Sequence, residues 1–276
     1  IGFCLVGSEM CIRDRTTVIL TDKTGTLTEN RMTVREIATA GGAVEVGGAA
    51  LDRSGEFKRN GQLLEAGDDP PLRALLESGV LCSNASWDGI EAIGDPMEVA
   101  LIVAAAKAGF EQETVRTAFP EVEEIAFDPA VNMMATYNKA DGSLRVAVKG
   151  APEAVLAHCT HIRVGPEAVP LEATDRDSWL ERNRGMADSG HRVLALAENA
   201  ATAATSDPYS NLTFLGLVGL VDPPRTDVQP AIVACQDAGV RVVMVTGDHP
   251  ATARNVAAAV GLASDGPVSY THLRAH

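Results

Sequence analysis

Residues 17–28 read TVILTDKTGTLT, a β-branched run followed by an aspartate, a lysine and a glycine-containing turn. The run Thr17–Thr21 predicts a short buried strand. A strand that ends at Asp22 places a carboxylate at the carboxyl edge of a sheet, where ligands bind in open α/β folds. A carboxylate there can attack a phosphoryl group and form an acyl phosphate. Lys23 adds positive charge, and the threonines and Gly25 offer hydroxyls and main-chain groups to phosphate or Mg²⁺.

The heptad DKTGTLT at 22–28 is identical to the phosphorylation motif of the P-type ATPases, the ion pumps that form an aspartyl phosphate. The continuation ENRMTV at 29–34 resembles the calcium and sodium/potassium pumps of that family. The resemblance implies that Asp22, Lys23 and Thr24 are catalytic. It also implies that Mg²⁺ bridges phosphate oxygens to Asp22 and to the Thr24 carbonyl.

Thr24 distinguishes a pump from a phosphatase. Phosphatases of the same haloacid-dehalogenase superfamily resemble D-x-D, with the second aspartate as general acid and base. A threonine cannot activate water in that way, so we expect the phosphorylated form of Asp22 to persist long enough to be coupled to another process.

Composition narrows the class of protein. The 276 residues carry 23 basic and 37 acidic side chains, a formal charge of −14, which argues against a nucleic-acid partner. The length predicts two domains. No run of 18 apolar residues occurs, so we expect no membrane-spanning segment in the chain. Five cysteines without a C-x-x-C pair indicate a reducing compartment.

The two ends of the sequence are related to each other. Residues 6–15 can be encoded by a DNA whose reverse complement encodes residues 267–276, and this inverted repeat resembles a sequencing adapter read in translation. We therefore expect 1–15 and 267–276 to be artefacts and leave them out of the fold.

Residues 38–211 are predicted to form a domain inserted into the first one. The stretch Ala40–Gly67 is rich in glycine and alanine and indicates weak hairpins and loops. Two helices and three strands are predicted after it, at 72–82, 97–104, 122–127, 132–137 and 144–148.

Four further matches to the P-type ATPases lie in this insert. They are Glu98 in GDPME, Phe127 in AFD, Lys149 with Gly150 in KGAPE, and Arg192 in HRVLALA. The resemblance implies that Glu98 faces the adenine, that Phe127 stacks on it, and that Arg192 reaches the phosphates. Val131-Asn132 precede Met133-Met134 where the family usually has basic residues, so no extra basic contact is expected on this strand.

After the insert, residues 213–221 predict a buried strand, followed by a helix with core positions Val228, Ile232, Val233 and Cys235. A strand at 240–245 and a helix at 251–260 come next. This order predicts a parallel, doubly wound sheet that includes the strand before Asp22, with the first domain at 16–37 and 212–266.

This return segment also resembles the pumps. TGDHPATA at 246–253 resembles bacterial members, which implies that Thr246, Gly247 and Asp248 are catalytic. DPPR at 222–225 matches too, which implies that Asp222 and Arg225 lie toward the nucleotide. No G-x-x-x-x-G-K-[ST] occurs, so a P-loop ATPase is not expected.

Taken together, the sequence predicts an α/β protein with an incomplete haloacid-dehalogenase-like parallel sheet and an inserted α+β nucleotide-binding domain. The resemblance implies the catalytic portion, on the cytoplasmic face of the membrane, of a bacterial cation pump that uses ATP and Mg²⁺. Its transported cation and its membrane contact would depend on transmembrane parts outside this chain. A soluble phosphatase of the same superfamily and an isolated nucleotide-binding module remain the alternatives.

The family also has a lysine and a G-D-G-x-N-D segment beyond T-G-D, and no G-D-G-x-N-D occurs here. We therefore expect the chain alone not to complete a catalytic cycle.

Overall fold

The structure is a computed structural model that describes residues 16–204, 207–247 and 250–262. Two compact units divide the chain. Unit 2 runs continuously over Arg31–Val221, and unit 1 contains the described residues on either side of it. Asp248 and the proposed adapter segments 1–15 and 267–276 lie outside the described residues.

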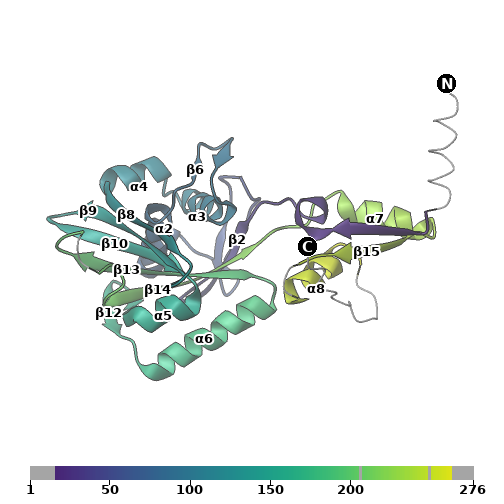
Figure 1. Cartoon of the computed structure of the whole chain (residues 1–276). Helices are drawn as coiled ribbons and strands as arrows, with labels where there is room; N and C mark the ends of the chain where they lie inside the picture. The colour runs from purple at the N-terminus through teal and green to yellow at the C-terminus, as the bar shows by residue number, and fades with distance from the viewer. Residues whose placement is uncertain (1–15, 205–206, 248–249, 263–276) are drawn as a thin grey trace. The chain divides into compact units, whose positions relative to one another are not determined.

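Unit 2 is built on a large, mostly antiparallel sheet (Figure 1). Its main strand order is β5-β4-β3-β2-β14-β13-β10-β9-β8, and β11 joins it by pairing in parallel with β14. The strands are β2 Thr33–Thr39, β3 Gly42–Val46, β4 Phe57–Arg59, β5 Gln62–Leu63, β8 Glu121–Asp128, β9 Met133–Ala140, β10 Ser143–Gly150, β11 Cys159–Val164, β12 Glu167–Pro170, β13 Arg192–Ala201 and β14 Leu212–Val221. A separate hairpin contains β6 Ser86–Trp87 and β7 Ala92–Ile93.

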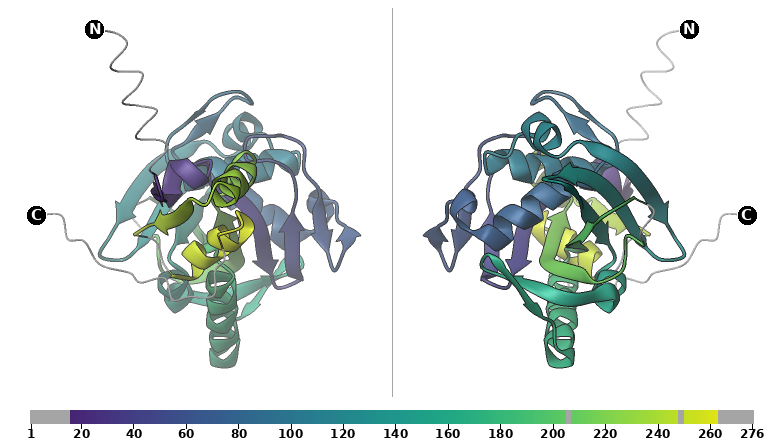
Figure 2. Two further views of the ribbon diagram at one scale, coloured as in Figure 1. Left: turned by 90° about the vertical axis from the view of Figure 1, so that its right-hand side faces the viewer. Right: turned by 90° about the vertical axis from the view of Figure 1, so that its left-hand side faces the viewer.

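Helices cover both faces of this sheet (Figure 1). One face carries α2 Pro70–Leu81, α3 Pro96–Lys107 and α4 Gln112–Ala118. The other carries α5 Pro152–His158 and α6 Ala173–Asp188, and the turned views of Figure 2 show α6 outside the sheet. Three of these helices begin at proline, whose missing N–H costs nothing in the first turn.

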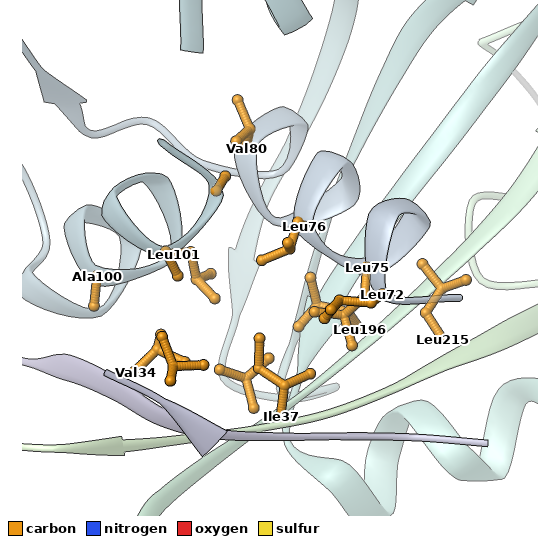
Figure 3. Packing of buried hydrophobic residues seen from close by; sticks show 14 of the residues in the cluster. Val34, Ile37, Leu72, Leu75, Leu76, Val80, Ala100, Leu101, Leu196 and Leu215 are labelled. Carbon is orange, nitrogen blue, oxygen red and sulfur yellow. The ribbon is translucent and has the colours of Figure 1, made fainter. Parts of the chain in front are cut away.

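The core of unit 2 lies between the helices and the sheet. Figure 3 shows Leu76 of α2 and Leu101 of α3 pointing toward Val34 and Ile37 of β2. On the opposite face, Phe214 of β14 is fully buried against Trp179 of α6, with ring centroids 5.0 Å apart. A helix layer on each face explains why strands such as β14 are apolar along most of their length.

Unit 1 contains a parallel strand pair, β1 Val18–Asp22 and β15 Arg241–Val245, with helices α7 Val228–Asp237 and α8 Pro250–Ala259. Leu27, Val228, Ile232 and Val260 form its buried cluster. Parallel pairing and strand–helix alternation agree with the α/β class predicted from the sequence. Two paired strands do not by themselves establish the complete doubly wound sheet that the sequence predicts.

Three expectations are wrong in detail. Residues 213–221 do not join the parallel pair, because β14 pairs antiparallel with β13 and β2 in the large sheet. The β1 strand is not buried: Leu20 is 70% exposed, because β1 has β15 as its one strand partner among the described residues. Val233 of α7 is 46% exposed, whereas Val228 and Ile232 face the buried cluster as predicted.

Limited proteolysis is expected to leave a protected fragment close to 31–221 while the flanking residues are digested. Unit 2 has extensive buried clusters on both faces of its sheet, whereas the described part of unit 1 exposes Val18, Ile19 and Leu20 of strand β1. Few buried apolar contacts favour local opening, which is what proteases detect. Mass spectrometry of the fragments over time checks this. Cleavage of both units at the same rate would contradict it.

Candidate functional site

The register of unit 2 brings four of the predicted residues to one end of its sheet. Gly150 at the end of β10 pairs with Met133 at the start of β9, and Met133 pairs with Asp128 at the end of β8. Gly150 also pairs with Ala195 on β13, three residues after Arg192. Phe127, Lys149, Gly150 and Arg192 therefore share one end of the sheet, although 65 residues separate the first from the last.

Lys149 is buried, with 8% of its surface exposed. Its ammonium donates to Glu98 Oε1 at 2.5 Å and to the Cys82 carbonyl at 2.5 Å. Burial raises the pKa of the neighbouring Cys82 thiol to about 12, so this thiol is uncharged near neutral pH. Lys149 is thus held by a carboxylate and a carbonyl rather than by a thiolate.

Glu98 is placed by the turn that starts α3. Gly94 adopts φ +115°, and a Cβ there would lie 2.8 Å from Ala85 Cα, so glycine is required on both counts. The Asp95 carboxylate caps the helix by accepting from Met97 N at 2.8 Å, and Pro96 is the first helical residue. The GDPME motif is therefore a tight turn and helix start that carries Glu98 toward Lys149.

The segment Cys82–Ala85, between α2 and β6, belongs to the same cluster and was not predicted from the sequence. Glu98 Oε2 accepts from Asn84 N at 2.7 Å and from Ala85 N at 2.9 Å. The Asn84 side chain donates through Nδ2 to Glu124 Oε1 of β8 at 2.9 Å. These are largely main-chain contacts, and residue type gives little sign of them.

Gly150 and Phe127 differ sharply in their surroundings. A Cβ on Gly150 would lie 2.3 Å from the Asn132 carbonyl, which accepts from Ala151 N at 3.0 Å, so the KGAPE turn has no room for a side chain there. Phe127 is 56% exposed at the end of β8, and Arg192 is exposed at the start of β13. An exposed ring and an exposed guanidinium lie at the same end as a buried ammonium, which is an arrangement suited to a ligand with an aromatic base and phosphates.

Unit 1 holds the predicted catalytic residues at the carboxyl ends of its two parallel strands. Asp22 ends β1 and is in register with Val245, so Thr246 and Gly247 leave β15 at the same edge. Asp22 is exposed, and its Oδ1 accepts from Lys23 N at 2.7 Å. Gly25 adopts φ +74°, a conformation that favours glycine, so the turn after Asp22 has a backbone reason for its glycine.

The two predicted residues of the DPPR segment lie in the same unit. Thr28 is fully buried, and its hydroxyl donates to Asp222 Oδ2 at 2.5 Å, which ties the DKTGTLT turn to the return segment. Arg225 N donates to the Leu27 carbonyl at 2.9 Å, and the Arg225 guanidinium is half exposed, 3.5 Å from Asp227. The DPPR segment therefore stabilises the turn that follows Asp22.

Among the residues that the structure describes, no helix is both long and apolar enough to cross a membrane.

Comparison with known proteins identifies the chain's relatives. A family model described as "P-type ATPase, cytoplasmic domain N" matches residues 71–227. The cation-transporting ATPase pma1 of Synechocystis is 37% identical over 264 residues, which is 91% of this chain and 29% of that protein. Calcium-transporting ATPase 1 of Bacillus cereus is 36% identical over 252 residues, 90% of this chain and 27% of that protein. The calcium-transporting ATPase of Bacillus subtilis is 35% identical over 250 residues, 87% of this chain and 28% of that protein. The chain thus spans less than a third of the length of each of these relatives.

Proposed function

Because this chain belongs to the P-type ATPases, we propose that it binds ATP with unit 2 and accepts the γ-phosphate on Asp22 of unit 1, as part of an ATP-driven cation pump. The observation that carries the proposal is the convergence of Lys149, Glu98, Phe127 and Arg192 at one end of the sheet of unit 2. The relatives named above are cation- and calcium-transporting ATPases, which supports a cation as the transported ion.

Unit 2 provides the nucleotide site in this proposal. Phe127 stacks on the base, because its exposed ring offers a face that any base can use. Lys149 supplies a cation held in a fixed position by Glu98 and the Cys82 carbonyl, and Arg192 supplies a second, exposed one for the phosphates. Glu98 faces the adenine in this proposal. Its carboxylate also accepts a hydrogen bond from the Lys149 ammonium.

The phosphoryl transfer itself takes place on unit 1. A carboxylate oxygen of Asp22 forms a bond to the γ-phosphorus as the bond to the bridging oxygen breaks, so ADP leaves with the electron pair and Asp22 becomes an acyl phosphate. Thr246 and Gly247, at the carboxyl end of β15, offer a hydroxyl and an amide to the transferred phosphoryl oxygens. Asp248 is assigned to the catalytic residues from the same TGD motif. Asp222 and Arg225 are assigned a place toward the nucleotide from their DPPR motif.

Mg²⁺ fits the donors that unit 1 presents. Asp22 and Thr24 are both exposed, and a carboxylate with a main-chain carbonyl is the oxygen ligand set that Mg²⁺ prefers. Bound there with ATP, it would neutralise charge on the phosphate oxygens. Asp22 and the Thr24 carbonyl would hold it. Lys23, assigned to the catalytic residues from the same motif, is buried, with 4% of its surface exposed.

Phe127→Ala is expected to weaken ATP binding by about 1–3 kcal/mol, roughly fivefold to over a hundredfold, because base stacking on an aromatic ring is lost. Isothermal titration of the chain with ATP measures this. Val122→Ala is the matched control, since Val122 is an exposed apolar residue at the opposite end of the same strand. Equal affinities for Phe127→Ala and the unaltered chain would remove Phe127 from the site.

A further inference from the structure

We infer that Gln112 and Arg116, on the short helix α4, are positioning residues for the nucleotide site, acting through the segment Cys82–Ala85 that holds Lys149 and Glu98. Neither side chain belongs to a motif identified in the sequence. The inference rests on the proposed function, because it concerns side chains that would help to hold Lys149, the buried cation of the proposed nucleotide site.

Two contacts join α4 to this segment. Gln112 Nε2 donates to the Ala85 carbonyl at 2.8 Å. The Arg116 guanidinium donates to the Ser83 carbonyl and reaches the Ala85 carbonyl at 3.5 Å. Both side chains are partly buried, and Val115 between them is 6% exposed and packs in the core that α2 and α3 share with the sheet. The helix is therefore anchored to the core while its polar side chains reach the segment.

The segment depends on side chains for most of its main-chain hydrogen bonds. The carbonyls of Cys82, Ser83 and Ala85 accept from Lys149, Arg116 and Gln112, and the amides of Asn84 and Ala85 donate to Glu98. Buried main-chain groups require partners, and two of the residues that provide them here, Gln112 and Arg116, lie outside the proposed nucleotide site. The segment Cys82–Ala85 is consequently held from two sides. Lys149 and Glu98 of the proposed nucleotide site hold one side, and α4 holds the other.

This arrangement transmits the position of α4 to the ammonium of Lys149. If the Ser83 and Ala85 carbonyls lose their partners, the adjoining Cys82 carbonyl and the two amides on Glu98 are free to shift. Both groups that hold Lys149 would then move together. Small displacements of a binding group are costly when the ligand requires a fixed geometry, which is how residues remote from a ligand affect its affinity.

Titration of the full chain with ATP tests the inference, with thermal unfolding measured for each variant. Gln112→Leu should weaken ATP binding about three- to tenfold, the size expected for one neutral hydrogen bond. Thr117→Ala, an exposed position on the same helix, is the matched control and should leave affinity unchanged. The decisive comparison is a double-mutant cycle with Lys149→Met: the effect of Gln112→Leu should vanish in that background, because it acts through Lys149.

Arg116 gives a second, independent variant. Arg116→Met should weaken ATP binding, and Arg116→Lys should recover part of the loss, because a lysine can still donate to one carbonyl. If Lys149→Met itself left ATP affinity unchanged, the proposed nucleotide site would fail. Two results would overturn the positioning role and leave the proposed function standing. One is weaker binding in Lys149→Met with no change in the Gln112 and Arg116 variants. The other is an effect of Gln112→Leu that is the same with and without Lys149.

Discussion

Asp22→Asn is expected to abolish transfer of ³²P from ATP to the full-length pump of which we propose this chain to be a part, while ATP binding persists. Asparagine keeps the size of the side chain at the end of β1 but lacks the nucleophilic carboxylate. Binding should survive because the nucleotide site that we propose lies in unit 2, which contains none of the residues around Asp22. The labelled protein should be stable in acid and lose its label to hydroxylamine, as an acyl phosphate does.

Asp237→Asn is the matched control for this experiment. Asp237 is an exposed aspartate at the end of α7 in the same unit, and labelling should be unaffected by its replacement. Labelling that persists in Asp22→Asn would move the phosphoryl acceptor to another residue. Loss of labelling together with loss of ATP binding would show instead that the substitution acts on the fold.

Lys149→Met should weaken ATP binding roughly 10- to 100-fold, since a hydrogen bond to a charged group contributes about 1.5–3 kcal/mol. Methionine keeps an unbranched side chain of similar length in the space between α2, α3 and the sheet, so the packing is largely preserved. What is lost is the one cation that Glu98 and the Cys82 carbonyl hold in place.

Lys139→Met provides the comparison for this variant, because Lys139 is an exposed lysine on β9, paired with Leu144 at the other end of the sheet. It changes the net charge equally, so a general electrostatic effect on ATP would appear in both variants. A loss of affinity confined to Lys149→Met supports a local contact. Equal, small losses in both would contradict it.

Much of the order of helices and strands follows from local signals. Prolines at 96 and 152 start helices where the sequence predicts them, and the three strands that end at Lys149-Gly150 have the expected place. The pairing of β14 was not predictable in this way. A buried apolar strand has the same composition in a parallel or an antiparallel sheet, and its partners β2 and β13 are chosen by non-local packing.

In the site, too, some features could be predicted from the sequence and others could not. Lys149, Glu98 and Phe127 could be proposed from motifs, because their side chains carry the chemistry. The contribution of Cys82–Ala85 comes mainly from carbonyls and amides, which every residue has, so composition does not reveal it. The exposure of β1 could not be anticipated either, because the sequence of a strand does not state how many neighbours cover it.

Photoaffinity labelling of the chain with 8-azido-ATP tests most directly whether the nucleotide binds at this end of the sheet of unit 2. We expect peptides containing Phe127 and Lys149 to carry the label, excess ATP to prevent labelling, and Phe127→Ala to reduce it. Label that ATP displaces from peptides of unit 1, or from the opposite end of the sheet near Lys139 and Arg145, would contradict the proposed site.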